Sequence, residues 1–164
     1  MRAVSALFLA ALALAGCDQQ RVQNLNEGLS TEADVRKQFG EPTQIIEKAD
    51  GSKLLEYPRQ PEGSTNYLAL IGPDGKLTAL TQQLTRENFE QVQPGMAQAA
   101  VRRLLGKPAQ MQRFALKPDE EHWDWRFQEP GGQRKVFAVT FGADALVKAT
   151  AITDDPRDTQ PGGR

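Results

Sequence analysis

Two segments of the chain carry apolar residues at helical spacing. In the segment 31–39, Val35 and Phe39 lie four residues apart and would share one face of a helix. The segment 96–105 repeats this pattern with a broader apolar face, made of Met96, Ala100, Val101, Leu104 and Leu105. A glycine and then a proline follow each segment, namely Gly40 and Pro42, and Gly106 and Pro108. The pattern predicts two helices that each end at a glycine in the left-handed backbone region.

The two predicted helices differ at their starts. Ser30 or Thr31 can cap the first helix, and Asp34 follows Thr31 by three residues, the spacing of a capping box with Asp in place of Glu. Ala97 stands at the start of the second helix and offers no side-chain oxygen. We therefore expect the second helix to begin without a side-chain cap.

The segments after both helices alternate between apolar and polar residues, which is typical of β-strands. The clearest case is 122–127, where one face would carry Trp123, Trp125 and Phe127 and the other His122, Asp124 and Arg126. Turn signals separate the strands at Asp50-Gly51, Pro73-Asp74-Gly75 and Pro130-Gly131-Gly132. Each helical region is thus expected to precede a three- or four-stranded antiparallel meander. This is an α+β fold with helices packed on one face of each sheet.

The same landmarks occur twice in one order. Those of the first copy include Val35, Gly40 and Pro42, and they recur 66 positions later as Val101, Gly106 and Pro108. Tyr57 corresponds to Trp125 after a small shift at a loop. The chain therefore reads as two tandem units, each with one or two short helices before its meander. We place the first unit at 22–85 and the second at 86–153.

The first residues have the pattern of a bacterial export signal. Arg2 is basic, the segment 3–15 is apolar and small apart from one serine, and Leu14-Ala15-Gly16-Cys17 matches a lipobox. The apolar run is shorter than the ~20 residues that span a bilayer. We predict that residues 1–16 are removed as a signal peptide and that Cys17 is lipidated. The alternative is an ordinary signal peptide that contains a cysteine.

Polar segments flank the two predicted units. Residues 17–21 read as a lipidated tether, so that folded sequence would start near Val22. Residues 154–164 contain no apolar side chain able to bury itself, and we expect a disordered tail. Cys17 is the only cysteine, so the processed chain would have no disulfide.

Composition and motifs argue against nucleic-acid binding and catalysis. The chain has 20 basic and 21 acidic residues, without the strong positive charge of nucleic-acid-binding proteins. His122 is the only histidine, and the neighbouring run Asp119–Glu121 reads as a solvated loop before a strand rather than as a metal site. No nucleophile elbow or phosphate-binding glycine motif occurs. We expect a protein that is not an enzyme and that needs no cofactor or metal.

Two groups of residues are candidates for binding. Trp123 and Trp125 could form an exposed aromatic stripe, although alternating aromatic residues in a strand more often belong to the core. Arg102 and Arg103, with Arg113, could form a basic patch for lipid headgroups or an acidic partner. A solvated helix face explains these arginines equally well.

The second copy resembles the SmpA/OmlA (BamE) family of bacterial lipoproteins. The resemblance lies in Gly95-Met96 and in the run Val101-Arg102-Arg103-Leu104-Leu105-Gly106-Lys107-Pro108, followed by the strand 123–127 and the turn 141–144. The first copy resembles the family more loosely. Two features depart from it, because the chain has two copies and Ala97 replaces the usual hydroxyl residue. The tandem arrangement is also similar to the β-lactamase-inhibitor protein, in which two such units form one concave sheet.

The resemblance implies an accessory protein that binds another protein. A BamE-like lipoprotein would face the periplasm from the outer membrane and support the machinery that inserts β-barrel proteins. The alternative is an inhibitor of a periplasmic enzyme, of the β-lactamase-inhibitor type. Asp18 directly follows the lipidated cysteine and argues instead for retention in the inner membrane, as in enteric bacteria. On balance we expect the outer membrane.

Overall fold

The computed structural model describes residues 13–159. Within them the chain forms two compact units. The first contains the residues up to Tyr57 together with Leu68–Thr81, and the second contains Pro58–Tyr67 and the residues from Gln82 on. The segment Pro58–Tyr67 therefore belongs to the second unit, whereas the sequence pattern suggested two contiguous segments.

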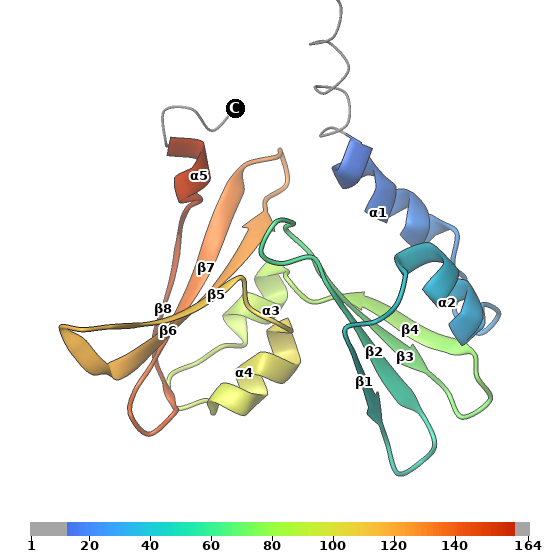
Figure 1. Ribbon diagram of the computed structural model, residues 1–164, viewed down its shortest axis with the longest axis horizontal. Helices are drawn as coiled ribbons and strands as arrows, with labels where there is room; N and C mark the ends of the chain where they lie inside the picture. Colours follow the sequence, from blue (N-terminus) through green and yellow to red (C-terminus); the bar gives the residue numbers. More distant parts are fainter. Residues whose placement is uncertain (1–12, 160–164) are drawn as a thin grey trace, which may run out of the picture. The chain divides into compact units, whose positions relative to one another are not determined.

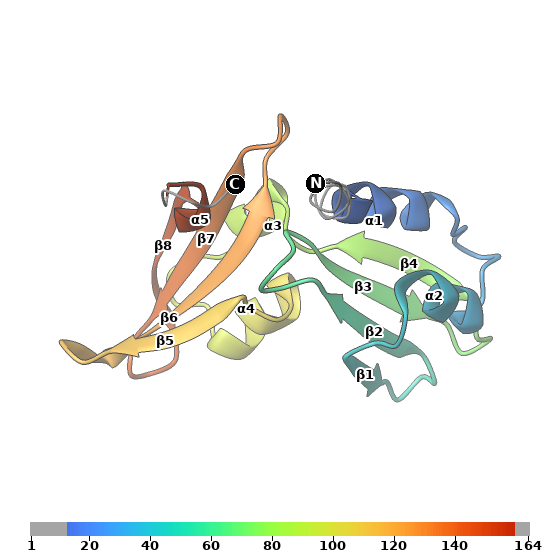
Figure 2. The ribbon, with the colours of Figure 1, turned by 45° about the horizontal axis from the view of Figure 1, so that its top comes forward.

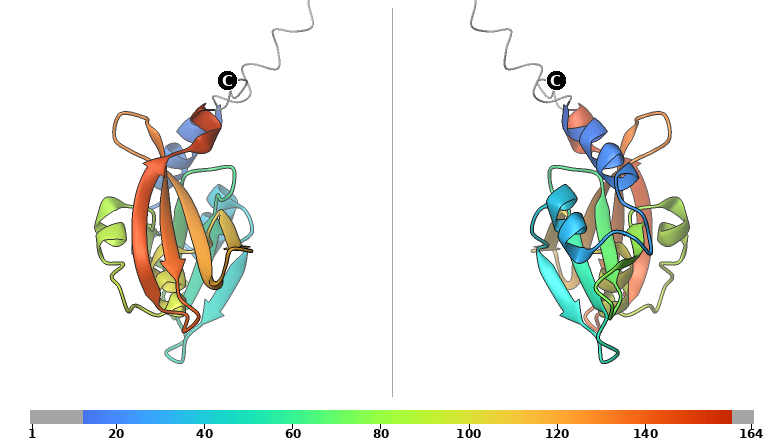
Figure 3. Two further views of the ribbon diagram at one scale, coloured as in Figure 1. Left: turned by 90° about the vertical axis from the view of Figure 1, so that its left-hand side faces the viewer. Right: turned by 90° about the vertical axis from the view of Figure 1, so that its right-hand side faces the viewer.

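The first unit pairs two helices with a four-stranded sheet (Figure 1). The strands follow one another in chain order, as predicted for a meander. The right-hand view of Figure 3 shows both helices on the same side of this sheet. The elements are α1 (Ala13–Gln23), α2 (Glu32–Phe39), β1 (Gln44–Glu47), β2 (Lys53–Pro58), β3 (Asn66–Ile71) and β4 (Leu77–Gln82).

The second unit repeats this order of elements. Its four strands also lie side by side in chain order (Figure 2) and pair antiparallel throughout. The α+β fold with antiparallel meanders is therefore confirmed. The elements are α3 (Arg86–Glu90), α4 (Gln98–Leu105), β5 (Gln110–Phe114), β6 (Lys117–Gln128), β7 (Arg134–Phe141), β8 (Val147–Asp154) and α5 (Pro156–Thr159).

The starts of α2 and α4 are as the sequence predicted, the first with a side-chain cap and the second without one. Thr31 caps α2 in a full capping box, since its hydroxyl accepts from the backbone N–H of Asp34 and the Asp34 carboxylate accepts from the backbone N–H of Thr31. Ala97 makes no side-chain hydrogen bond at the start of α4.

The helix ends depart in one detail from the expected left-handed glycine. Gly40 and Gly106 both have positive φ, at 85° and 73°, as expected, but their ψ values of −161° and −164° place them outside the left-handed helical well. That region is open essentially only to glycine.

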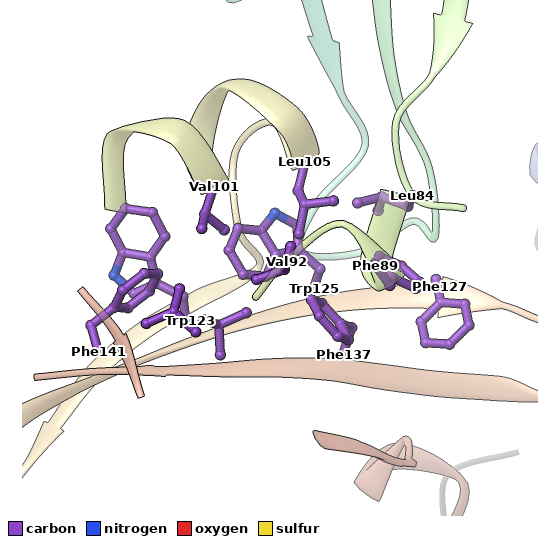
Figure 4. Close-up of a cluster of buried hydrophobic side chains, with 12 residues drawn as sticks. Leu84, Phe89, Val92, Val101, Leu105, Trp123, Trp125, Phe127, Phe137 and Phe141 are labelled. Atoms are coloured by element: carbon purple, nitrogen blue, oxygen red, sulfur yellow. The ribbon is translucent and has the colours of Figure 1, made fainter. Parts of the chain in front are cut away.

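One apolar cluster forms the core of the second unit (Figure 4). Helix α4 contributes Val101 and Leu105, and β6 contributes Trp125, all three fully buried. The indole nitrogen of Trp125 donates to the carbonyl oxygen of Gly106 over 3.1 Å, which ties the strand to the end of the helix. The ring of Phe89, from α3, stacks on that of Phe137 with centroids 4.4 Å apart.

The chain ends differ from the expectation in their described parts. Residues 17–21, predicted as a tether, lie within helix α1. The predicted disordered tail is wrong for 154–159, because β8 runs to Asp154, α5 follows, and the side chain of Asp155 is fully buried. Residues 1–12 of the predicted signal peptide and residues 160–164 of the tail lie outside the described residues.

Candidate binding surfaces of the second unit

Strand β6 has one face on the core under α4 and an opposite face with polar side chains. Because side chains alternate along a strand, Trp123 and Trp125 face α4, while His122, Asp124 and Arg126 lie on the opposite face. We call this second side the open face. The strand register sets Asp124 beside Ala138 of β7, which pairs with Ala151 of β8, so small side chains form the middle of the open face.

Gln60 completes the edge of β6 where β5 ends. The last pair between these strands joins Gln110 to Asp124, which leaves the backbone of Arg126 without a strand neighbour on that side. The amide of Gln60 fills this position, since it donates to the Arg126 carbonyl oxygen over 2.7 Å and accepts from the Arg126 N–H over 3.2 Å. A side-chain amide thus makes the two bonds that a neighbouring strand would make.

A buried charge cluster holds α5 at one end of the open face. The carboxylate of Asp155 accepts from the guanidinium of Arg157 over 2.7 Å and lies 3.5 Å from the Nε of Arg126. Burial raises the pKa of the Asp155 carboxyl, but the hydrogen bonds from Arg157 outweigh burial and bring the pKa below its usual value. Arg126 also donates to the carbonyl oxygen of Pro61 over 2.9 Å.

A hollow of about 130 Å³ lies on the open face beside this cluster. Its polar lining includes Asp124, and its lining residues are Ala109, Gln110, Asp124, Arg126, Val136, Ala138, Thr153 and Pro156. Burial raises the pKa of the Asp124 carboxyl, against the attraction of His122 and Arg126. We call this feature the Asp124 hollow.

His122 lies further along the open face and is held by its neighbours. Its Nδ1 is 3.2 Å from the hydroxyl oxygen of Thr140, and the ring of Phe114 meets the imidazole edge-on at 5.0 Å. Its Nε2 is 3.6 Å from a carboxylate oxygen of Glu120, whose pKa is lowered chiefly by a hydrogen bond from Lys148. The only histidine of the chain is therefore packed into the sheet.

The β5–β6 hairpin carries the most exposed apolar side chains of this unit. Met111 is 59% exposed, Phe114 47% and Leu116 96%. The two cations beside them form ion pairs, Arg113 with Glu121 at 2.7 Å and Lys117 with Glu120 at 3.4 Å. We call Met111, Phe114 and Leu116 the hairpin tip.

The tryptophans proposed as binding residues belong to the core. Trp125 is fully buried and Trp123 is 7% exposed, and the Trp123 indole nitrogen donates to Glu121 over 2.7 Å. The alternative of an exposed aromatic stripe is therefore wrong, and the core interpretation of the alternating pattern is correct. Sequence periodicity identified the face of these side chains but not the exposed hairpin tip, because that tip lies beyond the regular alternation.

The proposed basic patch divides between two elements. Arg102 and Arg103 lie on α4, where Arg102 is partly buried and Arg103 exposed, whereas Arg113 lies on β5 and pairs with Glu121. The lipidation residue Cys17 lies in α1, in the part of that helix whose side chains are not described.

Neither a metal site nor a membrane-spanning helix occurs in the described part of the chain. Between residues 13 and 159, no three His, Cys, Asp or Glu side chains gather closely enough to hold a metal ion. Over the same range, no helix has the length and apolar character needed to cross a membrane.

Comparison with protein families matches one part of the second unit. Residues 82–151 match the family described as Outer membrane protein assembly factor BamE domain. The BamE-like segment runs from the end of β4 through most of β8, so it includes α3, α4 and the core around Trp125. The match supports the family resemblance for this part of the second unit. No curated protein is similar enough to the chain to count as a match.

Proposed function

We propose that the protein is a lipid-anchored, periplasm-facing accessory in outer membrane protein assembly, which acts by binding another protein of the envelope. The observation that carries the proposal is the BamE match over residues 82–151. The lipobox at Leu14-Ala15-Gly16-Cys17 supports the anchor. The first unit, with the same order of helices and strands, supports a tandem pair of BamE-like units.

The hairpin tip is the part of the BamE-like segment best suited to contact a partner. Leu116 is almost fully exposed, and Met111 and Phe114 expose about half of their surface. Large exposed apolar side chains that are grouped on one hairpin are typical of a protein interface, whereas single scattered ones are common on any surface. Because Arg113 and Lys117 are paired with carboxylates, the tip has little net charge of its own. This composition favours an apolar protein surface as its partner.

Site-specific photo-cross-linking in intact cells tests the proposal. A photoreactive residue in place of Leu116 is expected to capture a component of the machinery that inserts β-barrel proteins. The matched control carries the same residue in place of Leu29, which is 73% exposed in the first unit. Capture by the Leu116 position alone would support the hairpin tip as the contact.

One outcome would contradict the proposed function, and another would contradict the hairpin tip as the contact. Recovery of one soluble periplasmic enzyme, with no assembly component, would favour the inhibitor alternative. Equal capture from both positions would mean that the hairpin tip does not select the partner.

A further inference from the structure

The Asp124 hollow combines an acidic group with apolar walls. Most of the lining is apolar, and the polar residues Gln110, Arg126 and Thr153 complete it around Asp124. The apolar lining residues are Ala109, Val136, Ala138 and Pro156. Its volume of about 130 Å³ exceeds the roughly 10–15 Å³ that admits one water molecule. It therefore has room for a side chain.

The carboxylate in this hollow lacks a partner. Within residues 13–159, the side chain of Asp124 makes no hydrogen bond and no ion pair, although it is only partly exposed. The neighbouring basic side chains contact other groups. Arg126 contacts Asp155 and the carbonyl oxygen of Pro61, and the Nδ1 of His122 lies against Thr140. Arg126 attracts the Asp124 carboxylate from a distance but makes no direct hydrogen bond or ion pair with it. A partly buried carboxylate without such a direct contact destabilises the fold.

A cation with an aliphatic stem fits these surroundings best. A long basic side chain places its methylene groups on apolar surface and keeps its charge at a polar end. The apolar walls suit the methylene groups of such a side chain, and the carboxylate of Asp124 suits its guanidinium or ammonium group. A divalent metal ion would need several more oxygen ligands than one carboxylate provides.

We infer that the Asp124 hollow binds a lysine or arginine side chain presented by a partner protein. The inference goes beyond the proposed assembly function, because it concerns a different surface from the hairpin tip and any cationic partner segment would satisfy it.

Titration of the full 164-residue chain with a capped amino acid tests this inference directly. The probe is Nα-acetyl-arginine methylamide, and the control is the citrulline compound, which has the same shape without the charge. The backbone amide NMR signals of Ala109, Ala138 and Thr153 are expected to shift saturably with the arginine probe. The citrulline compound should bind about tenfold more weakly or worse, which is the loss of one charge-assisted contact.

Two variants separate the charge from the shape of the hollow. Asp124→Asn removes the charge and is expected to abolish binding of the arginine probe. Ala138→Val keeps the charge, fills the floor of the hollow and is expected to weaken binding at least about tenfold. Asp119→Asn, an exposed position on the same strand, should leave the binding unchanged. NMR spectra with native dispersion would show that each variant is folded.

Four results would overturn the inference. The first three are no saturable shift with the arginine probe, equal binding of the citrulline compound, and unchanged binding by a folded Asp124→Asn variant. Saturable binding of ethanolamine at least as strong as that of the arginine probe would assign the hollow to a lipid headgroup amine and would also contradict it. Because the titration contains no assembly component, its failure leaves the cross-linking result at Leu116 unaffected.

Discussion

Gly40 and Gly106 end helices α2 and α4 with nearly the same backbone angles but different surroundings. A Cβ atom on Gly40 would meet nothing within 4 Å, whereas one on Gly106 would lie 2.6 Å from the Gln83 side-chain oxygen and 3.0 Å from the Asn66 side-chain nitrogen. Both of those amides donate to carbonyl groups at the end of α4, Asn66 to Leu105 over 2.8 Å and Gln83 to Arg103 over 3.0 Å.

The comparison of these two glycines gives a prediction for stability. Gly40→Ala should lower the free energy of unfolding by about 1 kcal/mol, because alanine is strained in this backbone conformation. Gly106→Ala should cost roughly 2–3 kcal/mol, because the methyl group also displaces two hydrogen-bonded amides. Chemical denaturation of both variants measures the difference. Equal losses would mean that Asn66 and Gln83 move aside without cost.

Ala145, in contrast to these two glycines, carries a side chain at a backbone conformation that favours glycine. Its φ of 58° is the only positive value of a non-glycine residue among the described positions, and Gly75 holds φ 77° in the corresponding β3–β4 turn. Ala145→Gly is therefore expected to stabilise the protein by about 0.5 kcal/mol, after the greater freedom of glycine in the unfolded chain is subtracted. Thermal melting measures it, with Gly75→Ala as the control that should destabilise.

Asp124 gives a prediction for the pH dependence of stability. Its folded pKa lies above the usual 3.8, so the unfolded chain loses this proton first as the pH rises. The contribution of Asp124 to the free energy of unfolding is therefore greatest below pH 3.8 and is lost as the pH rises through the folded pKa. Asp124→Asn should melt at a higher temperature than the unsubstituted protein at pH 7, and the difference should shrink as the pH falls toward 4. A constant difference across this range would contradict the raised pKa.

At the scale of elements, the contact between α4 and β6 is the structural centre of the second unit. Trp125 packs under Val101 and Leu105, and its indole nitrogen bonds to the residue that ends the helix (Figure 4). Trp125→Ala should destabilise the protein by roughly 3–5 kcal/mol. Trp125→Phe keeps an aromatic ring in the core but leaves the Gly106 carbonyl without its donor, and should cost at least about 1–2 kcal/mol. Denaturant titration followed by far-UV circular dichroism checks both values.

Local sequence patterns predicted these elements well, because their causes are local. The spacing of Val101 and Leu105 marks the buried side of α4, and the glycines and turn dipeptides mark where elements end. The bonds between Gln60 and Arg126 could not be predicted in the same way, since they join residues 66 positions apart and replace a missing strand. Asp155 is similar, because its polar neighbours in the sequence suggest disorder, whereas in the structure its carboxylate is buried beside Arg157 and Arg126 of β6.

At the scale of the whole molecule, local sequence patterns predicted the family better than the residues that bind a partner. The motif from Gly95 to Pro108 sufficed to suggest the BamE family, and the family match over residues 82–151 includes it. The residues with which a partner would be bound were harder to find. Trp123 and Trp125 had the aromatic character of a binding stripe but belong to the core, while Leu116 had no pattern to mark it. Core residues repeat with the period of an element, whereas surface residues for binding need not.

The proposed lipid anchor at Cys17 would hold the whole molecule at one of two membranes. Cys17→Ser should abolish labelling by radioactive palmitate and leave a precursor that keeps residues 1–16, provided that a general signal peptidase does not cleave it. Persistent labelling would show that Cys17 is not the lipidated residue. Density-gradient separation of the two membranes then locates the processed protein. We expect it with outer-membrane markers, because the BamE resemblance rests on many residues and Asp18 is a single opposing signal. If the protein is found only with inner-membrane markers and moves outward on Asp18→Ser, the outer-membrane location is wrong and the assembly function loses its main support.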